Sequence, residues 1–373
     1  MTDELLPVEA LERLSRQDGV DVRPILLRVL TDLFIQKPHH APEELVRYEE
    51  LALQLLDVVG VETRAVVARK LAGDPHAPQA VIARLLKDDV SVAGPILARS
   101  DKVSRHHLLT IALDGGVVEA SAVAQRADID ADMARILAHH RDERVVETLI
   151  ANPALQPTPQ TLATLVRRAH SAPVLAAAML RRSDFDPAAL SPLYLAAGPE
   201  QRGQIREAIA ARPGRAARAG RMTDQADAAM VEAAVASGDH ALMAEALSVA
   251  LGVSLNAAAT LAAEPSGEAF VFMLRGLGVE RDQIARALLL AQPEIARSVN
   301  RFFDLVELAE TTPRGVALEL VGALAGLQAP SQTAKHEPLF DPSGAPERAG
   351  AARSAARVRR APTRTSEPNR GRG

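Results

Sequence analysis

Residues 97–109 read LARSDKVSRHHLL, and the same spacing of apolar residues returns 26 residues later at 123–135, VAQRADIDADMAR. Apolar residues in the flanking stretches fall into the same register. The columns are Leu71, Leu97, Val123 and Leu149; Ala77, Val103, Ile129 and Leu155; Leu85, Ile111 and Leu137; and Val66, Val92 and Val118. A fixed period of this length is typical of helical-repeat proteins, in which each unit buries its apolar face against its neighbours.

The polar residues of the link between helices read as helix caps. Ser104, Asp130 and Asp186 each stand between an apolar residue and a helical run. A side-chain oxygen at this place can accept hydrogen bonds from the free N–H groups of the first helical turn. In a second set of stretches, Gly252 and Gly278 lie 26 residues apart. They are expected to end helices in the left-handed conformation that glycine adopts readily.

The repeat and the composition together predict an all-α protein. Hydrophobic residues make up 47% of the 373 residues and aromatic residues only 2%, so the core is built mainly from Ala, Leu, Val and Ile. A period of 26 residues accommodates two helices of about nine residues and two tight links. We expect a right-handed α-solenoid of short, HEAT-like helix pairs, then a helical C-terminal part and a disordered tail. The expected segments are capping helices at 1–60, the repeat solenoid at 61–212, a helical subdomain at 213–328 and a disordered basic tail at 329–373.

Three stretches carry a resemblance to a known family. They are LAGDPHAPQAVIARLL (71–86), DDVSVAGPILARSDKVSRHHLL (88–109) and FMLRGLGVERDQIARALLL (272–290). The chain resembles, over about residues 45–325, a group of proteobacterial proteins that share a domain of unknown function with HEAT-like helical repeats. The resemblance implies a helical-repeat fold and assigns no activity to any residue.

Neighbouring histidines are the first residues to consider as metal ligands. Adjacent residues on a helix point about 100° apart, so a pair such as His106 and His107 cannot bind one metal together. A site would need histidines from different units, and the candidate ligands are His107, His139 and His140. No cysteine, HExxH motif or carboxylate cluster accompanies them. Other units carry apolar residues at the places of His106 and His107, so these histidines are not a feature of the repeat. We interpret the histidine pairs as exposed residues at helix ends, and we predict no metal or other cofactor.

Motifs for catalysis, nucleotides and membranes are absent from the sequence. DGGVVEA (114–120) has paired glycines but lacks the spacing of a phosphate-binding loop, which favours a turn between helices. GxSxG does not occur, and no catalytic residue is predicted. The absence of cysteine, of an apolar run of about 18 residues and of a basic, apolar N-terminal stretch leads us to expect a cytoplasmic protein without a membrane span.

Basic charge is concentrated in two places. The formal net charge of the chain is −4, yet from Gln328 onward nine basic residues face four acidic ones. One cluster is RPGRAARAGR (212–221), and the other lies in the tail. The candidates for an electrostatic contact in the tail are Arg353, Arg357, Arg359, Arg360 and Arg364. Nucleic acid is expected as a partner only through this tail, and a solvated linker or tail is the favoured interpretation of both clusters.

The expected function is a non-enzymatic protein-protein interaction or scaffold role built on the helical-repeat surface, with a protein partner that the sequence does not identify. Packing constrains the caps and core columns, so the partner is expected at exposed positions of the second helices of units between about residues 88 and 182. One alternative is a ligand- or metal-binding helical-repeat enzyme with a pocket in the solenoid. A lesser alternative is nucleic-acid contact through the basic tail.

Overall fold

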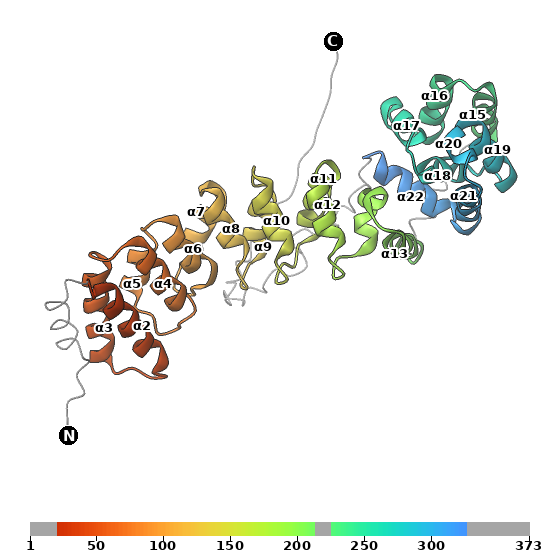
Figure 1. Ribbon diagram of the computed structural model, residues 1–373. Coiled ribbons are helices and arrows are strands. Elements are labelled where there is room, and N and C mark those ends of the chain that lie inside the picture. Colours follow the sequence, from red (N-terminus) through yellow and green to blue (C-terminus); the bar gives the residue numbers. More distant parts are fainter. Residues whose placement is uncertain (1–20, 213–224, 327–373) are drawn as a thin grey trace, which may run out of the picture. The chain divides into compact units, whose positions relative to one another are not determined.

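A computed structural model of the protein describes residues 21–212 and 225–326, where every regular element is a helix (Figure 1). The predicted all-α class is therefore confirmed for these residues. They belong to one compact unit that ends at Ala329, and it includes the described parts of the first three expected segments. The expected disordered tail, 329–373, lies outside the described residues.

The helices follow one another closely along the chain. The first group is α2 (Arg23–Gln36), α3 (Pro42–Leu56), α4 (Val61–Leu71), α5 (Gln79–Leu85), α6 (Val90–Arg99), α7 (Arg105–Asp114), α8 (Val117–Ala124), α9 (Ala131–Ala138), α10 (Glu143–Ala151), α11 (Pro159–Ser171), α12 (Pro173–Leu180), the 3₁₀ element η1 (Pro187–Ala196) and α13 (Pro199–Ala210). The second group is α15 (Gln225–Ser237), α16 (His240–Leu251), α17 (Leu255–Ala262), α18 (Glu268–Leu277), α19 (Arg281–Ala291), α20 (Pro293–Ala296), α21 (Val299–Thr311) and α22 (Arg314–Leu324).

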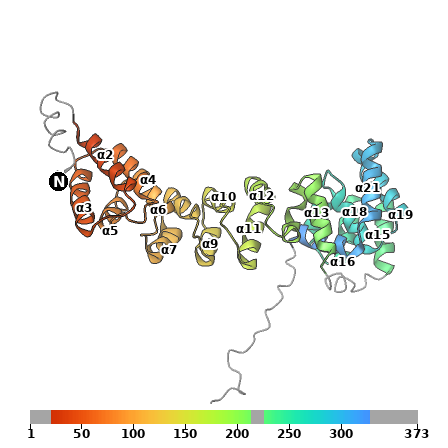
Figure 2. The same ribbon diagram turned by 90° about the horizontal axis from the view of Figure 1, so that it is seen from below.

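The helices from α2 to η1 are arranged in two rows (Figure 2). In the first row, α2, α4, α6, α8, α10 and α12 pack each on the next. The second row contains α3, α5, α7, α9, α11 and η1, and within it α3 packs on α5, α7 on α9, α9 on α11 and α11 on η1. One helix from each row forms a unit, and each unit buries apolar surface against the units beside it.

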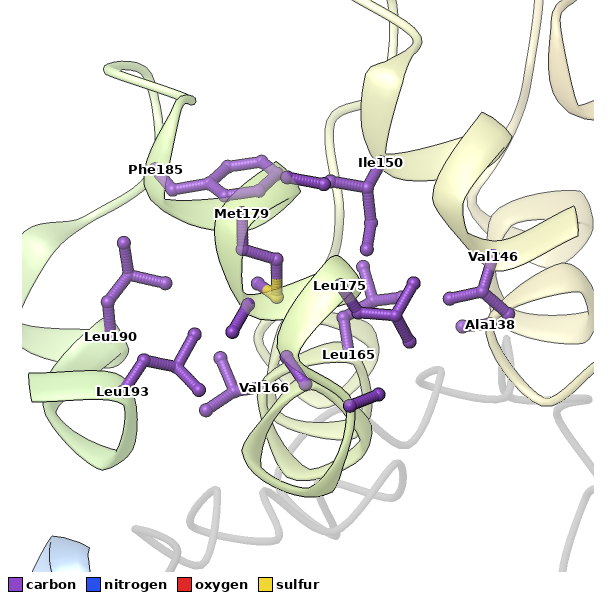
Figure 3. Close-up of a cluster of buried hydrophobic side chains, with 14 of the residues drawn as sticks. Ala138, Val146, Ile150, Leu165, Val166, Leu175, Met179, Phe185, Leu190 and Leu193 are labelled. Atoms are coloured by element: carbon purple, nitrogen blue, oxygen red, sulfur yellow. The ribbon is translucent and has the colours of Figure 1, made fainter. Parts of the chain in front are cut away.

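The core between neighbouring units consists of aliphatic side chains with few aromatic rings (Figure 3). Side chains from α9, α10, α11, α12 and η1 meet there. Those labelled in Figure 3 are Ala138, Val146, Ile150, Leu165, Val166, Leu175, Met179, Phe185, Leu190 and Leu193. Such a core excludes water by close packing of many small contacts, so a change in the volume of one side chain affects two units.

The apolar residue between the two helices of a unit points into the core in most units. Ala77, Val103, Leu155 and Phe185 are buried, and Ile129 is half-buried against the same core. The prediction that Val66, Val92 and Val118 occupy equivalent places in their units is wrong. Val92 is buried, but Val118 is 57% exposed and Val66 is half-buried. Val92 is the third residue of α6 but Val118 is the second residue of α8. A shift of one residue turns a side chain by about 100° around the helix.

Polar side chains cap the start of several second-row elements, as the sequence predicts for Ser104, Asp130 and Asp186. The Oγ of Ser104 accepts a hydrogen bond from the N–H of His107 at 3.3 Å. The carboxylate of Asp130 accepts one from the N–H of Met133 at 2.8 Å. The carboxylate of Asp186 accepts one from the N–H of Ala188 at 3.1 Å and begins η1. These contacts satisfy N–H groups that have no partner within the helix.

Two glycines end helices in the second group. Gly252 has φ of 65° and Gly278 has φ of 86°, a conformation that an L side chain rarely adopts. After Gly278, the N–H of Val279 donates to the carbonyl of Leu274, and the N–H of Gly278 donates to the carbonyl of Arg275. This pair of bonds is the Schellman motif, and it returns the chain to the core at the buried Val279.

A row of polar side chains, two of them buried and one partly buried, joins consecutive units, and sequence reasoning missed it. Arg126 is 3% exposed, and its Nη1 donates to the carbonyls of Leu97 and Ser100 at 2.8 and 3.0 Å. In the next unit, the Nδ2 of Asn152 donates to the carbonyls of Ala124 and Arg126 at 2.8 and 2.7 Å. We call Arg126, Asn152 and Arg182 the carbonyl ladder.

Arg182 continues the carbonyl ladder by one more unit. Its Nη1 donates to the carbonyls of Ile150 and Asn152 at 2.7 and 2.6 Å, and its guanidinium lies 4.5 Å from the centre of the Phe185 ring. The last carbonyls of a helix have no partner within that helix. Each ladder side chain therefore satisfies the end of a first-row helix in the preceding unit, and the bonds fix the register between units.

The two arginines of the carbonyl ladder predict an acid-dependent stability. Arg126 donates two hydrogen bonds to Asp128 and lowers its pKa, and Arg182 does the same to Asp184. Because these pKa values are lower in the folded than in the unfolded chain, the stabilisation is present above the unfolded value of about 3.9. It is lost as pH falls through the folded values. We expect the double variant Asp128→Asn, Asp184→Asn to lose less stability than the wild type between pH 5 and pH 3.

Urea denaturation at a series of pH values measures this dependence. The control is Asp101→Asn, which changes an exposed carboxylate that lacks an ion pair in the described part of the chain. An equal fall of the urea midpoint in the double variant and the wild type would contradict the assignment.

The second group of helices is joined to the end of the two rows by a polar cluster. The hydroxyl of Tyr194 in η1 donates to the carboxylate of Glu268 in α18 at 2.7 Å, and Arg202 of α13 forms an ion pair with the same carboxylate. Burial raises the pKa of Tyr194. The ring of Tyr194 also packs edge-on against Phe272 at 5.3 Å.

Candidate functional site

An open hollow lies between the C-terminal ends of α7 and α9, in the second row. Its volume is about 420 Å³. The residues that line it are Ala112, Leu113, Arg135, Ile136, His139, His140 and Arg141. We call it the basic hollow, because four of these side chains are basic and none is acidic.

Local helix-end chemistry positions the two histidines. His139 is the C-cap residue directly after α9, and its Nδ1 lies 2.9 Å from the carbonyl oxygen of Arg135. A carbonyl only accepts, so this Nδ1 carries the proton and leaves Nε2 as an acceptor in the neutral ring. The Nδ1 of His140 instead accepts from the N–H of Asp142 at 3.1 Å, so its Nε2 carries the proton. The neighbouring rings therefore present different groups, one acceptor and one donor.

The charges of the basic hollow are only partly balanced. Arg135 lies 3.6 Å from the carboxylate of Asp132, and both side chains are exposed. Arg141 is exposed and has no ion pair within residues 21–212 and 225–326. The nearby carboxylate of Asp142 accepts hydrogen bonds from Arg144, and these bonds lower the pKa of Asp142 to about 2. The floor is apolar and includes Leu113, which is among the most exposed leucines of the described chain.

The structure does not bring the candidate metal ligands together. His139 and His140 share the hollow, but His107 lies in the first turn of α7, five residues before the lining residue Ala112. Five residues span about 7.5 Å of helix. No group of three or more histidine, aspartate or glutamate side chains is placed to hold a metal ion among the described residues.

At the glycine pair Gly115 and Gly116, a side chain of the protein itself accepts the hydrogen bond that a phosphate would accept. Gly116 is the N-cap of α8, and its N–H donates to the carboxylate of Glu119 at 2.7 Å. A carboxylate at this helix start takes the place that a phosphate would need. The turn that the sequence favours at DGGVVEA is therefore the observed structure.

The predicted basic clusters lie almost wholly outside the described residues. Arg353, Arg357, Arg359, Arg360 and Arg364 lie there, as do residues 213–221. Arg212 is described, and it pairs with Asp186. This pair neutralises the one member of its cluster whose surroundings the structure describes.

A second hollow lies among α16, α17 and the end of α19. Its volume is about 610 Å³, and its lining is mostly alanine, with His240 as its ionisable side chain. In the described part of the chain, no single helix has both the length and the apolar character needed to cross a membrane. The pair α16 and α17, bent by 118° at the link, meets both criteria only when the two helices are taken together.

Comparisons with known proteins identify one family. The family model described as "Uncharacterised protein conserved in bacteria (DUF2336)" matches residues 92–314, which is more than half of the chain. The matched region runs from α6 into α22 and includes both helices of the basic hollow. Searches of curated proteins and of solved structures found no match.

Proposed function

For this chain, which belongs to the bacterial family DUF2336, we propose a non-enzymatic role as a protein-interaction module that uses the second-row face of α7, α9 and α11. The observation that carries the proposal is the basic hollow. Its lining combines two arginines, two histidines and an apolar floor. The expected resemblance to a bacterial family of unknown function is confirmed, and the family description assigns no role, so the support comes from the geometry alone.

The finer architecture is part of the same proposal. We take the two rows from α2 to η1 to be a right-handed, HEAT-like α-solenoid of short helix pairs. The order of packing along each row and the bonds of the carbonyl ladder support this assignment. Repeats of this kind present a long surface assembled from equivalent positions, which suits an extended protein segment.

The chemistry of the hollow selects the kind of partner. Arginine binds carboxylates through two parallel hydrogen bonds, and the exposed Arg141 has no carboxylate partner in the described structure. Leu113 and Ile136 offer apolar contact beside it. We therefore propose that the hollow binds a segment with an aspartate or glutamate next to an apolar side chain.

The proposal is tested by selecting peptides from a displayed library of bacterial protein segments on the full chain. Enriched peptides are expected to be acidic with one apolar residue. The double variant Arg135→Glu, Arg141→Glu should bind them more weakly by about 2 kcal/mol, or ~30-fold in Kd, because like charges then face the carboxylates. Fluorescence anisotropy with the enriched peptides measures Kd.

Arg99→Glu is the matched control, since Arg99 is an exposed arginine at the end of a first-row helix. It should leave the Kd within about twofold of wild type. Peptides that bind the double variant and the wild type equally would remove the hollow from the proposal. A stoichiometric metal in the purified chain would favour the alternative of a metal-binding enzyme. Salt-sensitive binding of a labelled RNA or DNA, with no peptide enriched, would favour nucleic acid.

A further inference from the structure

The first helix of the two rows has an exposed apolar face. Ile25, Val29 and Leu33 recur every four residues on α2, so they share one side of the helix. They are 51%, 37% and 44% exposed. We call these three residues the α2 face.

The position of α2 in the fold explains why no helix among residues 21–212 and 225–326 covers this face. α2 packs on α3 and α4 through its opposite side, where Leu27, Leu30 and Phe34 are buried. Its neighbour α4 lies between α2 and α6 and is covered from both directions. The end of a repeat stack needs a cap, because an end unit otherwise exposes the surface that inner units bury.

The chain contains a segment suited to this role. Residues 1–20 precede α2 and its N-cap. Besides Met1 and Ala10, their apolar residues are Leu5, Leu6, Val8, Leu11, Leu14 and Val20. Leu11 lies ten positions before Asp21, and a stretch of this length can span up to about 33 Å. Val29 lies six residues into α2, only about 9 Å along its axis. The segment is therefore long enough to return along the helix.

Charge agrees with this assignment. Arg28 lies on the same side of α2 as Ile25, three residues further on, and its partner in the structure is the hydroxyl of Thr63 at 3.5 Å. The neighbouring Asp32 is already paired with Lys70. Residues 1–20 contain Glu4, Glu9 and Glu12 between their apolar residues, so a glutamate can pair with Arg28 while the apolar residues contact the α2 face.

We propose that residues 1–20 pack against Ile25, Val29 and Leu33 and form the N-terminal cap of the stack. The cap covers an apolar patch that would otherwise be available to a second molecule. The cap does not involve the basic hollow, so this proposal does not depend on the proposed function.

Disulfide trapping in the full chain tests the cap, because the natural sequence has no cysteine. The test variant carries Leu11→Cys and Val29→Cys. A second carries Leu14→Cys and Ile25→Cys in case the first does not fold, because a segment that returns along α2 places Leu14 nearer the start of the helix than Leu11. The control carries Leu11→Cys and Glu50→Cys, where Glu50 is an exposed residue of α3. Equilibration in glutathione buffers followed by mass spectrometry gives the effective concentration of each pair.

The effective concentration of at least one test pair is expected to exceed that of the control pair at least tenfold, with the disulfide inside one chain. Effective concentrations equal to the control for both test pairs would overturn the proposal. Disulfides formed mainly between two chains would also overturn it and would assign the α2 face to a second copy of the protein.

Discussion

Arg126→Met is expected to lower the free energy of unfolding by about 3 kcal/mol. Methionine keeps much of the length of the arginine side chain but has no N–H group. The carbonyls of Leu97 and Ser100, which accept from Arg126 at 2.8 and 3.0 Å, then lose their donor in a buried place. Each unpaired buried group costs about 1–3 kcal/mol, which is more than a hydrogen bond contributes when it is made.

Urea denaturation followed by circular dichroism measures the loss, with the free energy taken by linear extrapolation. Arg99→Met is the matched control, because Arg99 is exposed at the end of α6 and should change stability by less than about 0.5 kcal/mol. Arg126→Lys should fall between the two, since one ammonium cannot reproduce the planar set of donors. Equal unfolding midpoints for Arg126→Met and Arg99→Met would show that the carbonyl ladder does not hold the units together.

Val103→Asp is expected to destabilise the protein by about 4 kcal/mol or more. Val103 is 6% exposed and lies in the link between α6 and α7, so an aspartate there buries a carboxylate in the hydrophobic core. A buried charge without a partner loses its hydration and gains nothing in return. Thermal melts and urea midpoints of the variant measure the effect.

Two variants bracket this prediction. Ile129→Asp changes the equivalent residue of the next unit, which is half-buried, so its effect should be clearly smaller. His106→Ala changes an exposed residue in the first turn of α7 and should be nearly neutral. A larger loss for His106→Ala than for Val103→Asp would mean that the start of α7 is assigned in the wrong register.

The helical class and the links between helices could be predicted because the signals are local. A cap such as Ser104 contacts a backbone N–H three residues away. Glycine at position 278 allows the positive φ that the backbone has at this same residue. The period also located the buried residues of the link, including Val103. The 26-residue period gave the wrong position for Val118. The first-row helices start at intervals that differ from one another by a residue or more, so a constant period does not match them all.

The candidate site was predicted less well, since His139 and His140 were considered as metal ligands with His107. The structure separates His107 from them and places Arg135 and Arg141 beside them instead. The sequence does carry a signal for the carbonyl ladder, a polar residue three positions before the apolar residue of the link. Arg126, Asn152 and Arg182 all occupy that place. The signal was missed because arginine and asparagine at a helix end ordinarily indicate an exposed residue.

By itself, the sequence determined that this chain forms short helices, where many of them begin and end, and which residues of the links turn inward. Those features depend on hydrogen bonds and side-chain directions within one or two helical turns. Only the tertiary structure decided that Arg126 is buried, that the basic hollow exists and that the α2 face is exposed. Each of these depends on which residue of one unit lies against which residue of another. The hydrogen-bond partners of Arg126, for example, are 26 to 29 residues away in the sequence. The packing of whole helices sets that register.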